Sequence, residues 1–124
     1  MNQEEMKQRT KLFALGIIQL VESLPKERTA EVLGRQLLRS GTSVGSNYRS
    51  ACRAKSIADF ISKMGIVEEE ADESLYWMEL LIEAGIEISI NMGALMKEAR
   101  ELLAITVSSI KTARKNKKID RSRT

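Results

Sequence analysis

Apolar side chains recur every three or four residues along four separate stretches of this chain, and this periodicity constrains its fold more than any other feature. Such spacing places the apolar residues on one face of an α-helix. The single proline, Pro25, disfavours helical backbone at the residue before it and so separates the first stretch from the second. The sequence therefore predicts an all-α protein, an up-and-down antiparallel bundle of four helices.

The first helix is expected from about Gln3 to Ser23. Its core stripe comprises Met6, Phe13, Ile17, Leu20 and Leu24. Further apolar residues widen this face beyond the needs of one bundle seam, which indicates contact with another subunit or with a covering segment. The interface residues expected from this helix are Leu12, Leu15 and Ile18.

The second helix is expected to begin near Thr29, a suitable N-cap, and to carry apolar and small residues in register as far as Ala51. Gly41 and Gly45 each cost about 1 kcal/mol relative to alanine in a helix interior. The run GTSVG therefore fits either one continuous helix with a weak middle or a break between two shorter helices. We favour the continuous helix.

Ser56 followed by Asp59 resembles a capping box and marks the start of the third helix, which continues to a C′ glycine at Gly85. Residues 85–89 are expected to form a loop, and a fourth helix to start near Asn91. The chain is thus predicted to be one bundle over residues 1–114, followed by a flexible basic tail over 115–124.

The cysteine and histidine content excludes several classes of chemistry. The chain has one cysteine and no histidine, so an intramolecular disulfide, imidazole metal sites and Ser-His catalysis are impossible. Cys52 is expected to be a buried core residue. The acidic run from Glu68 to Glu73 is interpreted as a solvated helix face rather than a metal site. We expect no enzyme activity, no cofactor and no metal.

No stretch of the sequence is suited to a membrane. The longest nearly uncharged segment, residues 12–21, has only ten residues, against the roughly 20 that a spanning helix needs. The first residues also lack the basic start and cleavage site of a signal peptide. A cytoplasmic protein without a membrane partner is expected.

Charge is distributed unevenly along the chain. Residues 26–63 hold eight basic and three acidic side chains, residues 64–101 two and ten, and residues 111–124 seven and one. The turn between the second and third helices gathers several of these bases at one end of the bundle, where they can attract phosphates without reading sequence. The nucleic-acid-binding residues expected from this pattern are Arg39, Arg49, Arg53, Lys55, Lys63, Lys111, Arg114, Lys115, Lys117 and Lys118.

Alternative interpretations remain open for these residues. Arg49 and Arg53 can instead form ion pairs with acidic residues of the third helix, in the same or a neighbouring subunit. The tail can be a merely solvated basic end. Tyr76 and Trp77 lie beside the main apolar stripe of the third helix, where ordinary packing or a subunit contact would explain them.

The run RSGTSVGSNYRSACRAKS from Arg39 to Ser56, followed by Ala58-Asp59-Phe60, Lys63-Met64 and Tyr76-Trp77, resembles a known family. These are the four-helix-bundle proteins encoded within intervening sequences of bacterial 23S ribosomal RNA genes. The resemblance implies a ring-like homopentamer. The family's basic positions match Arg39, Arg49, Arg53, Lys55 and Lys63, and its small-residue run matches Gly41 to Ser46.

The sequence is also similar to the accessory variability determinant of diversity-generating retroelements. That similarity implies RNA or DNA and a reverse transcriptase as partners. The leading hypothesis is a non-enzymatic homo-oligomeric, pentameric bundle with sequence-independent RNA or DNA binding through its basic residues. The alternative is a structural or scaffolding module that contacts proteins and binds no nucleic acid.

Overall fold

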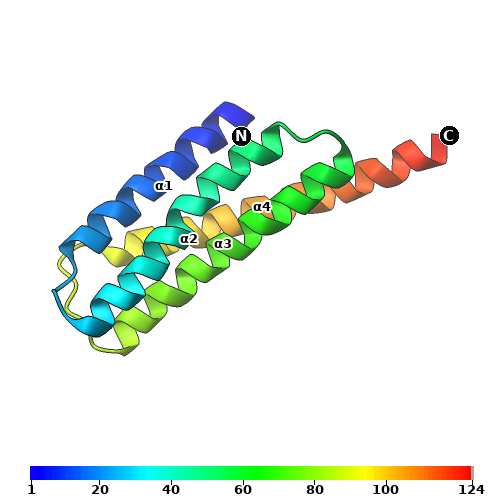
Figure 1. Ribbon diagram of the computed structural model, residues 1–124. Helices are drawn as coiled ribbons and strands as arrows, with labels where there is room; N and C mark the ends of the chain where they lie inside the picture. The colour runs from blue at the N-terminus through cyan, green and yellow to red at the C-terminus, as the bar shows by residue number, and fades with distance from the viewer. Residues whose placement is uncertain (124) are drawn as a thin grey trace.

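The protein forms four helices joined by short connections, in a computed structural model that describes residues 1–123. The helices are α1 (Gln3–Ser23), α2 (Arg28–Cys52), α3 (Ile57–Glu83) and α4 (Met92–Arg123). Each runs antiparallel to the one before it (Figure 1). The predicted all-α four-helix bundle is confirmed.

Local capping chemistry sets both ends of α3 where the sequence predicts them. The Ser56 hydroxyl accepts a hydrogen bond from the Asp59 N–H at 3.1 Å, while the Asp59 carboxylate accepts one from the Lys55 N–H at 3.0 Å. Gly85 has a positive φ of 74° and follows α3 in a Schellman motif, in which the Ile86 N–H donates to the Leu81 carbonyl at 3.1 Å. The start and end signals of α3 are thus confirmed.

The start of α2 differs from the prediction. Thr29 is not its N-cap, because the helix begins at Arg28 and Glu27 occupies the capping position without a side-chain hydrogen bond. The Glu31 N–H instead donates to the Glu27 carbonyl at 2.9 Å. The N-cap therefore lies two residues earlier than the hydroxyl signal indicates, and the first turn relies on backbone bonding.

The middle of α2 is continuous, as favoured from the sequence. Its glycines allow α1 to approach closely: a Cβ at Gly41 would lie 2.8 Å from the branched carbons of Ile17, and one at Gly45 would lie 3.1 Å from the Thr10 hydroxyl. Side chains of α1 therefore occupy the space that a β-carbon would take at both glycines. The conformational cost of the glycines is offset by close packing of α1 against α2.

The core runs along the centre of the four helices. Packing is most extensive between α2 and α3 and least extensive between α1 and α4. Its largest fully buried apolar side chains are Ile17, Leu20, Leu37, Val44, Met64, Val67, Met78, Leu81 and Leu102. Cys52 is only half-buried and lies at the edge of this core, which corrects the expectation of a buried thiol.

The last helix extends beyond the bundle. In Figure 1 the C-terminal part of α4 continues past the α2–α3 connection, on the same end of the molecule as the N-terminus. Its last buried residue is Ala113, close to the predicted bundle boundary at residue 114. The segment predicted as a basic tail is helical through Arg123. Its flexibility stays a prediction. Thr124 lies outside the described residues.

Candidate nucleic-acid interface

The basic residues at the end of α2 are exposed and available for contacts. Arg49 lies in the last turn of α2, Arg53 caps the helix and Lys55 belongs to the connection to α3. Among the residues that the structure describes, no carboxylate lies within ion-pair distance of any of the three. Intrachain pairing of Arg49 and Arg53 with acidic residues of α3, one of the two alternatives, is therefore not what the structure contains.

Lys63 differs from its neighbours because it is engaged within its own helix. Its ammonium lies 3.0 Å from the Asp59 carboxylate one turn earlier. Hydrogen bonds from the Lys55 N–H and from Lys63 lower the pKa of Asp59. Asp59 is thus the acidic residue that partly offsets the basic turn, as its position in the sequence indicates.

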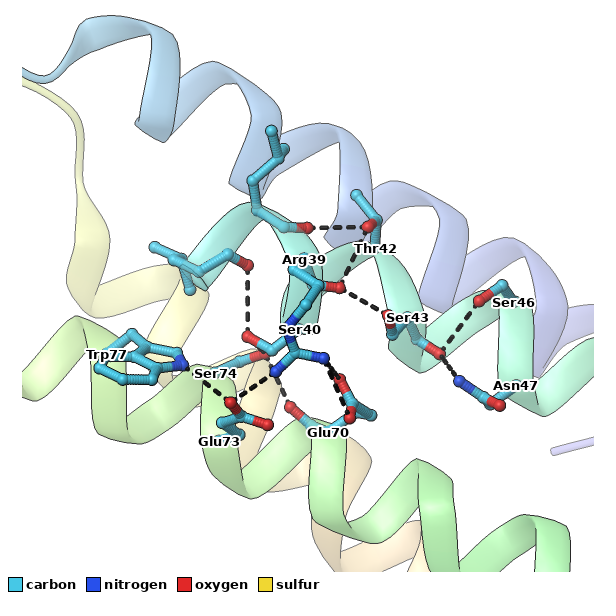
Figure 2. A network of polar contacts seen from close by, with 12 residues as sticks. Arg39, Ser40, Thr42, Ser43, Ser46, Asn47, Glu70, Glu73, Ser74 and Trp77 are labelled. Carbon is cyan, nitrogen blue, oxygen red and sulfur yellow. Dashed lines mark hydrogen bonds and ion pairs between the residues drawn. The ribbon is translucent and has the colours of Figure 1, made fainter. Parts of the chain in front are cut away.

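Arg39 lies in the middle of the bundle, where it bridges α2 and α3 (Figure 2). Its guanidinium contacts Glu70 at 3.2 Å and Glu73 at 2.5 Å. Glu73 also accepts a hydrogen bond from the Trp77 indole at 3.2 Å, and the Arg39 hydrogen bond is the main cause of its lowered pKa. The geometry gives Arg39 a role in holding two helices together.

Five basic residues of α4 lie in its last turn within the bundle and on the part that projects beyond it. Lys111, Arg114, Lys115 and Lys118 are exposed and Lys117 is half-buried. None of the five has an ion-pair partner within the described chain. The structure therefore brings these unpaired cations to the same end as Arg49, Arg53 and Lys55.

A pocket of about 590 Å³ connects the turn to α4. Lys55 and Ser56 form its wall on the turn side, and Thr112 and Asn116 form its wall on α4. Ile57, Phe60 and Ala113 supply apolar surface, and no carboxylate lines the pocket. The basic turn and the basic helix thus lie on either side of one recess that holds no negative charge.

The outer face of α1 carries the apolar residues that the sequence assigns to an interface. Leu12, Leu15 and Ile18 are 58%, 49% and 38% exposed. They point away from the core residues of the same helix, and no other helix of the described chain buries them. On α3, the rings of exposed Tyr76 and half-buried Trp77 form an edge-on pair with centroids 5.1 Å apart.

Two lysines outside the predicted set share a groove with Arg49. Lys7 and Lys11 line a groove between α1 and α2 into which Arg49 also extends. The net charge of their segment does not point to these lysines, because residues 1–25 hold three basic and three acidic side chains, which balance. The available signal was their spacing, since residues four apart share a helix face.

Serines in the middle of α2 are engaged in local hydrogen bonds, and the described residues form no cluster of metal ligands. The Ser43 and Ser46 hydroxyls donate to backbone carbonyls within α2, at 2.6 and 3.3 Å. Within the described part of the chain, no group of three acidic or cysteine side chains converges to hold a metal ion. No helix there is long and apolar enough to cross a membrane.

Comparison with known proteins agrees with the resemblance carried by the sequence. The family model described as 23S rRNA-intervening sequence protein matches residues 2–108. A crystal structure of a protein of unknown function from the S23 ribosomal protein family of Bacteroides thetaiotaomicron is 37% identical, with a TM-score of 0.81. The match covers 90% of this chain and 99% of that one. No curated protein matches the chain.

Proposed function

The chain belongs to the 23S rRNA-intervening sequence protein family, and we propose that it is a non-enzymatic, homo-oligomeric bundle that binds RNA or DNA without sequence preference. The observation behind this proposal is a set of cations at one end of the bundle that have no ion-pair partner among the described residues: Arg49, Arg53, Lys55, Lys111, Arg114, Lys115, Lys117 and Lys118. Their positions follow from the fold, because α2 and α4 both run towards the end of the bundle that carries the α2–α3 turn (Figure 1).

The chemistry of these cations favours phosphate over bases. Lysine and arginine side chains that neutralise phosphates release condensed counterions, and this release drives sequence-independent binding. Sequence readout would require side chains positioned against base edges in a groove. The exposed groups at this end are long, flexible and cationic, so they suit the backbone of either nucleic acid.

Titration of the protein with labelled RNA and DNA at low and moderate salt tests this proposal. We expect binding that weakens steeply with salt, with a slope of log affinity against log salt of about −0.7 for each single-strand phosphate contacted. Oligonucleotides of different sequence and equal length should bind alike. Absence of binding at low salt would contradict the proposal and leave the scaffolding alternative.

Self-association is the second part of the proposal, and the exposed stripe on α1 supports it. An apolar stripe that no helix of the same chain covers is typical of a surface buried between subunits. Sizing with light scattering should return a multiple of the 13.9 kDa chain mass, with a pentamer expected from the family resemblance. Replacing Leu12, Leu15 and Ile18 together by glutamine should shift the mass towards the monomer, and a monomeric wild-type protein would contradict this part.

A further inference from the structure

A groove of about 450 Å³ lies between the first half of α1 and the second half of α2. We propose that this groove is a phosphate-binding subsite in which Lys7 and Lys11 of α1 and Arg49 of α2 hold one phosphate group between them. The inference rests on the proposed function for its physiological ligand, a nucleic-acid backbone. It adds two residues and a defined location to that function.

The geometry of the two helices makes the groove. Lys7 and Lys11 are four residues apart and therefore project from one face of α1. Gly45 allows α2 to approach α1 closely, since a Cβ there would lie 3.1 Å from the Thr10 hydroxyl and 3.3 Å from its Cβ. Close approach at this point brings the long side chains of α1 and of Arg49 to opposite sides of one narrow cleft.

The charge of the lining favours an anion. Glu4 is its only carboxylate, against three cations. Glu4 contacts Lys7 at 3.3 Å, but its side chain is 84% exposed, and an exposed pair at this spacing holds its partner weakly. Lys11 and Arg49 have no ion-pair partner among the described residues. A phosphate can therefore replace Glu4 as the partner of Lys7.

The polar neutral residues of the groove define what else a ligand meets. The Thr10 hydroxyl donates to the Lys7 carbonyl at 3.0 Å, and the Thr42 hydroxyl donates to the Leu38 carbonyl at 2.7 Å. Their hydrogens are thus already used, so these groups offer only acceptors. Recognition falls to the cations and to the Gln8 amide, which together suit a tetrahedral oxyanion and offer nothing that distinguishes one base from another.

The position of Arg49 links the groove to the basic end of the bundle. Arg49 lies one turn before the Arg53 cap, so a strand bound at the α2–α3 turn can continue along α2 into the groove. Phosphate groups reach such a site from a nucleic acid or from a free oligophosphate. The same cations would hold either, and the two sources are separated by using labelled single-stranded RNA and inorganic tripolyphosphate as probes.

Loss of the two lysines is the first test. The double variant K7Q/K11Q should weaken RNA binding about tenfold and lower the salt slope by about one. The matched control is K26Q/K97Q, which removes the same charge from exposed lysines outside the groove. Circular dichroism of both variants checks that they fold.

Removal of the competing carboxylate is the second test, and misfolding cannot mimic its result. The variant E4Q should bind RNA about threefold more tightly because Lys7 is released. The control E5Q makes the same charge change at the neighbouring residue, which does not line the groove. Equal effects of E4Q and E5Q would show that the tighter RNA binding comes only from the change in net charge. That result would overturn the proposed subsite.

The outcomes separate this proposal from the proposed function. If wild-type protein binds RNA and K7Q/K11Q behaves like K26Q/K97Q, the subsite is wrong and the proposed function stands. If the protein binds tripolyphosphate through Lys7 and Lys11 but binds no RNA, the phosphate site is supported with a free ligand and the proposed function fails. Binding of neither probe at low salt overturns both.

Discussion

The middle of the bundle and its end at the α2–α3 turn use the same residue types for opposite purposes. Arg9 of α1 bonds to Glu98 and Glu101 of α4, and in the middle of α2 Arg39 bonds to Glu70 and Glu73 of α3. At the end, Arg49, Arg53 and Lys55 have no such partner in the described chain. Arginine therefore forms ion pairs between helices in one region and is an exposed, unpaired charge of the described chain in the other.

The difference follows from where the acidic residues lie. The carboxylates of α3 are concentrated in its central turns, from Glu68 to Glu73, so they reach the middle of α2 but not its last turn. Only Asp59 lies near the turn, and it is bonded to Lys63 and to the Lys55 N–H. We therefore expect mutations of the paired arginines to lower the stability of the fold, and mutations at the α2–α3 turn to weaken nucleic-acid binding.

The largest expected effect is on binding, from the triple variant R49Q/R53Q/K55Q. Three lost phosphate contacts should weaken RNA binding about 100-fold and reduce the salt slope by about two. The thermal midpoint should change little, because exposed unpaired charges contribute less than about 1 kcal/mol to folding. Fluorescence anisotropy with labelled RNA and thermal melts measure the two properties on the same samples.

The variant R39Q is the control for this separation. It removes one of the same charges, but from the middle of the bundle, so it should lower the thermal midpoint and leave RNA binding within about twofold of wild type. A strong loss of RNA binding in R39Q would contradict the division into two regions. It would instead support the sequence-based assignment of Arg39 to the nucleic-acid-binding set.

The next largest effect is on stability, from filling the close contact between α1 and α2. In G41A the new methyl group would lie 2.8 Å from Ile17, so we expect a net loss of about 1–3 kcal/mol despite the better helix propensity of alanine. In G65A nothing lies within 4 Å of the new methyl group, and the same change should stabilise α3 by up to about 1 kcal/mol. Urea unfolding curves for the pair check the opposite signs, and a stabilising G41A would contradict the close packing.

A smaller loss of stability is expected from R9M. The Arg9 guanidinium donates at 2.7 Å to both oxygens of Glu98, and only about a quarter of each side chain is exposed. Its removal leaves Glu98 partly buried without a partner in the least extensive seam, at a cost of about 1–2 kcal/mol. A double-mutant cycle with E98Q isolates the pair, and a coupling energy near zero would show that packing alone closes this seam.

The sequence predicts the helices of this fold well, but it predicts poorly which charged side chains pair with one another. Periodicity and caps identify all four helices, and the Ser56 and Gly85 signals succeed because they are local. Thr29 fails as an N-cap because the helix already begins at Arg28, where the Glu27 carbonyl accepts a backbone hydrogen bond from the Glu31 N–H. Arg39 cannot be separated from Arg49 by sequence, since their roles depend on which turn of α3 lies opposite each one.

The smallest expected effect is a pH dependence located in the middle of the bundle. The Arg39 hydrogen bond lowers the pKa of Glu73 in the folded protein, so the unfolded chain takes up its proton at a higher pH. This contribution to stability is fully present above the ordinary glutamate pKa of 4.5 in the unfolded chain, and it is lost as the pH falls through the lower folded value. Urea unfolding at intervals from neutral pH to below that window should therefore show a steeper acid loss in wild type than in R39Q. Equal slopes would mean that Arg39 and Glu73 are not coupled in solution, and the middle of the bundle would then differ from its end in packing alone.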